Sequence, residues 1–163
     1  MSKKDQLSAN DLRILSLLQR DGRASYADIA AAAGMTAPSA HERVKRLEAR
    51  GVIRGYAAQV DAAAVGFGVL AFSWIRQSPG MATKDPTNDF ASIPEVEECH
   101  HVAGEADYLL KIRASDTLDL ERVMRSVQAI EGVYTSETEI VFSTGFEGRP
   151  LPLERETAEG PGA

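Results

Sequence analysis

The chain lacks several features that define secreted, membrane-bound and disulfide-stabilised proteins. Cysteine occurs once in 163 residues, at Cys99, so an internal disulfide is impossible and a reducing cytoplasm is the expected location. No apolar run follows Lys3 and Lys4, as a secretory leader would require. The most apolar stretch, residues 62–74, is too short to span a bilayer and is interrupted by two glycines. We therefore expect no membrane partner.

Motifs for catalysis and for cofactor binding are also missing. The sequence has neither a Ser/His/Asp series nor a glycine-rich phosphate loop. Cys99, His100 and His101 suggest a metal site, but neighbours on a strand point to opposite faces, so Cys99 and His101 share one side and His100 takes the other. Four zinc ligands would need distant carboxylates. We expect no metal, no cofactor and no catalytic residues.

The charge is divided unevenly along the chain. Residues 1–60 carry ten lysines and arginines against six acidic residues, whereas residues 61–163 carry eight against eighteen. The halves thus have net charges of +4 and −10, and the whole chain has −6. Only the N-terminal part has a charge suited to phosphate contacts. The alternative to a phosphate-binding role is that these charged side chains simply form the solvated surface of a helix.

The N-terminal part predicts three short helices. The first has an apolar stripe from Leu7 to Leu18, with Ser8 or Asn10 as its cap. The second opens at Ser25, which forms a capping-box pattern with Asp28. It ends at a glycine that begins the next turn. Two helices joined by such a turn indicate a helix-turn-helix.

The third helix lies between Thr36 and Gly51 and has a polar face suited to nucleic acid. Thr36 is its expected cap, Pro38 lies where a missing N–H costs nothing, and Gly51 ends it. Ala40, Val44 and Leu47 fall on one side at helical spacing and are expected to pack. Residues 52–56 then switch to strand chemistry and predict a wing.

The opposite side of this helix carries the candidate contacts to double-stranded DNA. We expect phosphate contacts from basic side chains and base contacts from polar ones, the set being Ser39, His41, Glu42, Arg43, Lys45, Arg46 and Arg54, with Arg23, Lys3 and Lys4 as further candidates for phosphate. Arg43 lies on the flank, so a salt bridge within the domain is an equal alternative. Glu42 either accepts a hydrogen bond from cytosine or is simply solvated.

The second half predicts the order βαββαβ. Strands are expected at residues 69–75, 96–102, 108–112 and 133–142, with a short helix opened by Asp85 as cap and a longer one over residues 120–130. This order is typical of a ferredoxin-like domain with both helices on one sheet face. The other face needs a cover, so a homodimer is expected. The predicted domains are 1–61 and 62–148, followed by a mobile tail at 149–163.

Together these segments resemble the Lrp/AsnC, or feast/famine, transcription regulators over nearly the whole chain. The resemblance rests on the order and spacing of Asp21-Gly22-Arg23, Gly34-Met35-Thr36, Arg43-Val44-Lys45-Arg46-Leu47-Glu48, Gly51-Val52-Ile53, Pro94-Glu95-Val96, Cys99-His100, Gly104-Glu105-Ala106-Asp107-Tyr108, Glu131-Gly132-Val133 and Thr138. It implies an α+β protein with a winged helix-turn-helix and a ferredoxin-like domain. It also implies dimers that assemble further, as into an octamer, and a response to amino acids. Glu42 departs from the family, which frequently has a basic residue there.

The turn at residues 104–107 is the candidate effector site. Its backbone N–H groups and the Asp107 carboxylate complement the two ends of a free amino acid, and the resemblance adds Ser136 and Thr138. On the residues alone, an ordinary turn with Gly104 for its conformation is the better interpretation.

Two other functions remain open at this point. One is an enzyme on the same architecture, because sirohaem decarboxylases resemble this family. The other is an architectural DNA-binding protein without an effector. The basic face around Lys45 and Arg46 favours a transcription regulator, since an enzyme has no need of it.

Overall fold

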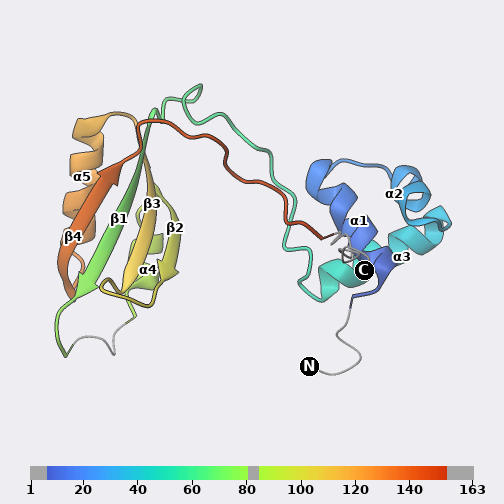
Figure 1. The fold of residues 1–163 in the computed structure, drawn as a ribbon, viewed down its shortest axis with the longest axis horizontal. Helices are drawn as coiled ribbons and strands as arrows, with labels where there is room; N and C mark the ends of the chain where they lie inside the picture. Colours follow the sequence, from blue (N-terminus) through green and yellow to red (C-terminus); the bar gives the residue numbers. More distant parts are fainter. Residues whose placement is uncertain (1–6, 81–84, 154–163) are drawn as a thin grey trace, which may run out of the picture. The chain divides into compact units, whose positions relative to one another are not determined.

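The computed structural model describes residues 7–80 and 85–153. The described chain divides into two compact units, one made of residues 7–58 with 146–153 and the other of residues 59–80 with 85–145 (Figure 1). The domain limits expected from the sequence, after residues 61 and 148, stay predictions. Lys3, Lys4 and the end of the expected tail lie outside the described residues.

The first unit is a trio of capped helices: α1 (Ala9–Arg20), α2 (Tyr26–Ala33) and α3 (Ala37–Ala49). Ser8, Ser25 and Thr36 each accept a hydrogen bond from the backbone three residues later, which confirms the expected caps. The side chains that meet between the helices are fully buried or nearly so: Ile14, Ile29, Ala30, Ala33, Ala40, Val44 and Leu47. Three of these seven residues are alanines, and larger aliphatic side chains fill the rest of the core.

Two glycines end helices as the sequence predicts. Gly34 follows α2 with φ 64°, and Gly51 follows α3 with φ 68°. Both lie in the left-handed region, which glycine enters without a steric penalty. The turn between α2 and α3 therefore has a fixed geometry.

The strand expected at residues 52–56 does not form. This segment is a turn followed by chain without regular secondary structure. The Tyr56 ring instead lies close to Gly22, where the Cβ of any other residue would be 3.5 Å from the ring. The Tyr56 hydroxyl donates to Glu48 at 3.1 Å. The prediction of a strand here was wrong, because a strand needs a hydrogen-bonded partner, which the described residues of this unit do not supply.

The segment after the second unit returns to α1. Leu151 donates its backbone N–H to Gln19 Oε1 at 2.8 Å, and Gln19 Nε2 donates to the Leu151 carbonyl at 3.2 Å. The Gln19 amide thus satisfies both the backbone N–H and the carbonyl of Leu151. The part of the expected tail that the structure describes is held at this point.

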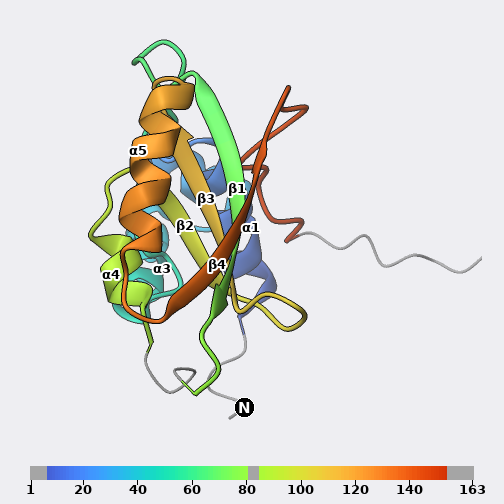
Figure 2. The ribbon, with the colours of Figure 1, turned by 90° about the vertical axis from the view of Figure 1, so that its left-hand side faces the viewer.

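The second unit is a four-stranded antiparallel sheet with two helices: β1 (Val69–Gln77), α4 (Thr87–Ala91), β2 (Val96–His101), β3 (Tyr108–Ala114), α5 (Thr117–Gln128) and β4 (Val133–Ile140). The strand order is β2-β3-β1-β4, which is the ferredoxin-like order predicted from the sequence. Figure 2 shows α4 and α5 on the same face of this sheet.

The cap of α4 differs from the prediction. Pro86 occupies the N-cap and makes no side-chain cap. Asp85 accepts hydrogen bonds from the backbone and the hydroxyl of Thr87, at 2.9 and 2.5 Å, so it closes a turn before the helix. Phe90, on this helix, is fully buried in the core of the unit.

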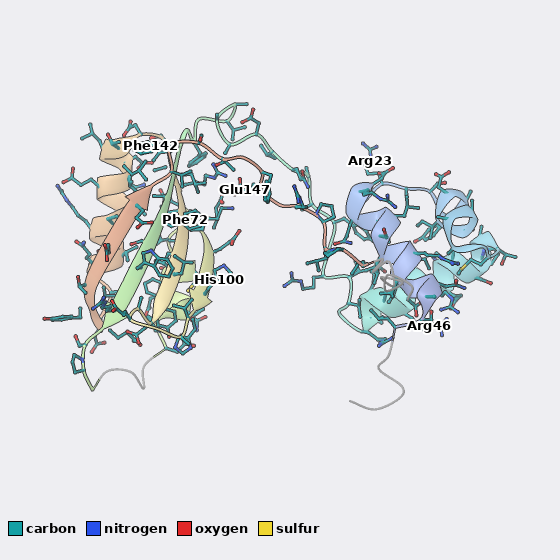
Figure 3. All side chains as sticks on the ribbon, viewed as in Figure 1. Arg23, Arg46, Phe72, His100, Phe142 and Glu147 are labelled. Atoms are coloured by element: carbon teal, nitrogen blue, oxygen red, sulfur yellow. The ribbon has the colours of Figure 1, made fainter. Side chains whose placement is uncertain are left out.

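Alternation along the strands separates two sheet faces. The face under α4 and α5 carries the core, with Ala71, Ile75, Leu110 and Ile112 fully buried. The opposite face, called the outer face below, carries Phe72, Trp74, Leu109 and Lys111 as strand neighbours in register. Figure 3 labels Phe72 and His100 on this face.

No helix among the described residues is long and apolar enough to cross a membrane.

Candidate functional site

Helix α3 presents a polar face to solvent. The exposed residues on it include most of the predicted DNA contacts: Ser39, His41, Glu42, Lys45 and Arg46. These five are called the exposed face of α3 below. They turn away from the buried stripe of Ala40, Val44 and Leu47, as helical periodicity predicts. Arg54 is exposed as well.

Arg43 does not belong to this face. Its guanidinium Nη1 donates to Asp11 Oδ1 at 2.8 Å and to Ser8 Oγ at 3.2 Å. Burial raises the pKa of Asp11, but hydrogen bonds from Ser8 and the Arg43 guanidinium outweigh it and hold the pKa below its usual 3.8. Of the two interpretations of Arg43, the structure therefore has the salt bridge within the unit.

Other charges near α3 are partly engaged. Lys45 Nζ lies 3.4 Å from Glu48 Oε2, with 60% of the lysine side chain exposed, so it remains accessible to phosphate. His41 packs edge-on against Tyr26, with ring centroids 4.8 Å apart. The side chains of Glu42 and Arg46 have no hydrogen bond or ion pair within residues 7–80 and 85–153.

The exposed face of α3 borders an open hollow. Its volume is about 440 Å³, and its walls come from α1, the turn and α3: Asn10, Met35, Pro38, Ser39, Glu42, Arg43 and Arg46. Figure 3 labels Arg46 on this unit. A concave surface with unpaired polar groups fits the edge of a duplex groove.

A second open hollow, of about 430 Å³, lies in the other unit beside the turn at residues 104–107. Its lining includes Trp74, Arg76, Gly104, Glu105, Thr135, Glu137 and Glu139. Arg76 Nη2 lies 2.9 Å from Glu105 Oε2 across it. With three carboxylates and one guanidinium at its rim, this hollow is suited to a small zwitterion.

The structure separates the four residues predicted for effector binding. Gly104 lines the hollow. Asp107 points back into the sheet, because its Oδ2 accepts from the Gln77 backbone N–H at 2.7 Å. Ser136 accepts from Gln128 Nε2 at 2.9 Å, and Thr138 shares a 2.9 Å hydrogen bond with Ser73.

The strand register explains this separation. Ser136 and Thr138 pair with Ile75 and Ser73, which are fully buried beneath the helices. Their neighbours Thr135 and Glu137 therefore point to the outer face and line the hollow. Sequence reasoning missed Thr135, Glu137, Trp74 and Arg76. Assigning alternate residues of β1 and β4 to opposite faces of the sheet would have found them.

The Cys-His-His run on β2 is arranged as predicted. Cys99 and His101 pair with Leu110 and Tyr108, whereas His100 pairs with Leu109 on the other face. His101 stacks on Tyr108 with centroids 4.9 Å apart. Within the described residues, no three His, Cys, Asp or Glu side chains lie together as a metal site requires.

Comparison with known families agrees with this arrangement. Residues 7–54 match the family model of a winged helix-turn-helix DNA-binding domain, and residues 70–151 match that of the Lrp/AsnC ligand binding domain. The first model therefore covers α1 to α3, and the second covers the sheet with its hollow and most of the segment that follows it.

Several curated proteins are similar over most of their length. The chain is 35% identical over 132 residues to the HTH-type transcriptional regulator LrpA of Mycobacterium tuberculosis, covering 81% of this chain and 87% of that protein. It is 36% identical over 136 residues to the leucine-responsive regulatory protein of Rhizobium meliloti, covering 82% and 87%. It is 31% identical over 144 residues to regulator FL11 of Pyrococcus horikoshii, covering 88% and 95%.

Solved structures give the same result. A feast or famine regulatory protein from Mycobacterium tuberculosis complexed with L-methionine has a TM-score of 0.80 and 32% identity, covering 88% of this chain and 97% of that one. A transcriptional regulator from Neisseria meningitidis, also with L-methionine, has a TM-score of 0.83 and 27% identity, covering 91% and 97%. The relatives are regulators rather than enzymes, which decides against a sirohaem-decarboxylase-like activity. The chain belongs to the Lrp/AsnC family of DNA-binding transcription regulators.

Proposed function

We propose that the chain docks α3 in the major groove of its operator and responds to a free amino acid bound in the hollow beside Gly104. The observation that carries the first part is the exposed face of α3, which combines accessible cations with unpaired polar groups. Lys45 and Arg46 would meet phosphate, as would Arg54 and Arg23, while Ser39, His41 and Glu42 reach base edges. Arg43 would contact no DNA and would instead hold α3 against α1 through Asp11.

The proposed effector site is the hollow beside Gly104. Its lining differs from the set of four residues expected from the sequence. An amino acid's ammonium group would meet Glu105, Glu137 or Glu139, and its carboxylate would meet Arg76 or backbone N–H groups of the turn. Asp107 shapes that turn. Ser136 and Thr138 have no place in this site, because they lie on the other face of the sheet. The two similar structures that hold L-methionine support an amino acid as the ligand class.

A second copy of the chain is the proposed cover of the outer face. Phe72 and Leu109 are half-buried there and Trp74 is 37% exposed, so the face is apolar enough to associate and lies wholly in the second unit. Dimerisation would also bring two copies of α3 to one operator. Higher assemblies, such as an octamer, would then form from dimers.

The test is DNA binding by the full chain with and without each of the twenty amino acids. Operators are first selected from random duplexes, and affinity and sedimentation are then measured together. We expect at least one amino acid to change both, because a ligand shifts an assembly only when it binds its states unequally. The sole tryptophan, Trp74, lines the hollow, so its fluorescence reports binding directly.

Two matched variants make the test specific. Glu105→Gln changes a hollow residue with 91% of its side chain exposed, and Glu121→Gln changes an exposed glutamate on α5, away from the hollow. The first should alter the amino-acid response and the second should not. Sequence-specific binding with no response to any amino acid would instead indicate an effector-independent architectural protein.

A further inference from the structure

We propose that Glu42 reads cytosine in the operator and so sets base preference at one position of each half-site. This inference rests on the proposed docking of α3 in the major groove. Glu42 is an exposed acidic side chain on the polar face of α3. The structure adds three observations: its position on the helix, its lack of a partner, and the rigid support of α3.

Glu42 lies directly opposite the side of α3 that packs. Ala40 and Val44, two residues before and after it, are 0% and 2% exposed. At 3.6 residues per turn, two residues correspond to a rotation of about 200°, so the Glu42 side chain leaves the helix on the far side from both. A side chain in this position, in the N-terminal half of a recognition helix, reaches deepest into the groove.

The Glu42 carboxylate has no partner within the described chain, although candidates surround it. Arg43 is engaged by Asp11 and Ser8, and Lys45 is closest to Glu48. Arg46 lies one turn further along the same hollow without an ion pair to Glu42. An unpaired carboxylate that approached DNA would be repelled by phosphate, so a donor in the groove is needed to offset that cost.

Cytosine offers that donor with the smallest adjacent penalty. A carboxylate accepts hydrogen bonds and donates none. In the major groove, guanine presents O6 and N7 and thymine presents O4, and all of these are acceptors. The adenine amino group lies between two acceptors, its own N7 and O4 of the paired thymine, whereas the cytosine N4 amino group has an acceptor on one side only, O6 of the paired guanine. The predicted order of preference is cytosine first and adenine second.

The support of α3 makes this preference sharp. Arg43 fastens the middle of α3 to the N-terminus of α1, and Thr36 caps its start by accepting from the Ser39 N–H. Glu42 precedes Arg43 directly, so its backbone position is fixed relative to the rest of the unit. A reading side chain on a rigid element discriminates better than one on a loop.

The experiment compares full-length wild type with Glu42→Gln on operators that carry each base at each position. For the wild type we expect cytosine at one position per half-site to be favoured by about 5- to 150-fold, as a good base contact gives. Glutamine both donates and accepts, so Glu42→Gln should move the preference at that position to adenine. Preferences elsewhere should stay.

A modified base tests the contact itself. Replacing the cytosine with pyrimidin-2-one removes the N4 amino group and, with it, one hydrogen bond of the base pair, a change that wild type and Glu42→Ala meet alike. This should weaken wild-type binding about as much as the Glu42→Ala substitution does, and should have little further effect on the Glu42→Ala protein, since one contact cannot be lost twice. Glu48→Gln is the matched control, because Glu48 binds Tyr56 and should leave base preference unchanged.

The outcomes separate this inference from the docking on which it rests. If wild type binds all duplexes equally, the docking of α3 is wrong. If wild type is selective and Glu42→Gln selects the same bases, the docking stands and the cytosine contact is overturned. A gain in affinity of Glu42→Gln that is equal for every sequence would also overturn it, because Glu42 would then only repel phosphate.

Discussion

Arg43 and Asp11 join the exposed helix α3 to the start of α1 through a 2.8 Å salt bridge. The same Asp11 carboxylate accepts from the Ser8 backbone and hydroxyl, at 2.9 and 2.6 Å, so one side chain closes a capping box and receives an arginine. Asp11 is well shielded, with 13% of its side chain exposed. The orientation of α3 therefore depends on a side chain in the first turn of another helix.

Replacing Asp11 with Asn should lower the free energy of unfolding of the first unit by about 1–2 kcal/mol, since a charge-assisted pair is lost. The pH dependence has a definite sign. The pKa of Asp11 is lowered on folding, so its stabilising effect is present above pH ~4 and is lost as pH falls through the folded pKa. Denaturant unfolding of the full chain between pH 2 and 7 measures this.

Asp28 provides the control for that measurement. It closes an equivalent capping box with Ser25 on α2, but it has no arginine partner among the described residues. Asp28→Asn should therefore cost a cap alone, about 1 kcal/mol. Equal losses in both variants would show that the Arg43 pair contributes nothing measurable.

Replacing Lys45 and Arg46 together with Ala should weaken DNA binding and flatten its salt dependence. Each phosphate contact contributes about 0.9 to the slope of log affinity against log salt, so the slope should fall by roughly one to two units per docked subunit. Binding is measured at four or more salt concentrations. An unchanged slope contradicts the placement of both cations on phosphate.

Tyr56 should ionise unusually late. Burial and its hydrogen bond to the Glu48 carboxylate raise the pKa of Tyr56 from 10 to about 12. Because the folded pKa lies above the unfolded one, this stabilisation is complete below pH ~10 and disappears as pH rises through 12. The difference between the absorbance titrations of wild type and Tyr56→Phe isolates the ionisation of the Tyr56 hydroxyl. In Glu48→Gln the pKa should shift back toward 10.

Asp107→Asn should destabilise the second unit without preventing amino-acid binding. Its Oδ2 accepts from the Gln77 N–H at 2.7 Å, and the loss of that charged acceptor should cost about 1–2 kcal/mol. Thermal unfolding gives the stability, and Trp74 fluorescence gives the binding. Complete loss of amino-acid binding in a folded Asp107→Asn protein would show that Asp107 takes part in the effector site.

Much of the architecture was determined by the sequence alone, because the signals that specify it are local. Ser8, Ser25 and Thr36 cap helices through contacts only three residues long, and Gly34 and Gly51 end helices through their own backbone freedom. Periodicity likewise predicted the packed side of α3 and the βαββαβ order. Such features need no knowledge of distant residues.

The tertiary structure decided whatever depends on a partner far along the chain. Arg43 meets Asp11 across 32 residues, and nothing local distinguishes that pair from a free arginine that contacts DNA. The register of β4 on β1 sends Thr135 and Glu137 to the hollow and Ser136 to the opposite face. A shift of one residue would reverse that assignment, since side chains alternate with period two. Local sequence therefore predicted the elements, whereas long-range pairing selected the side chains that form the sites.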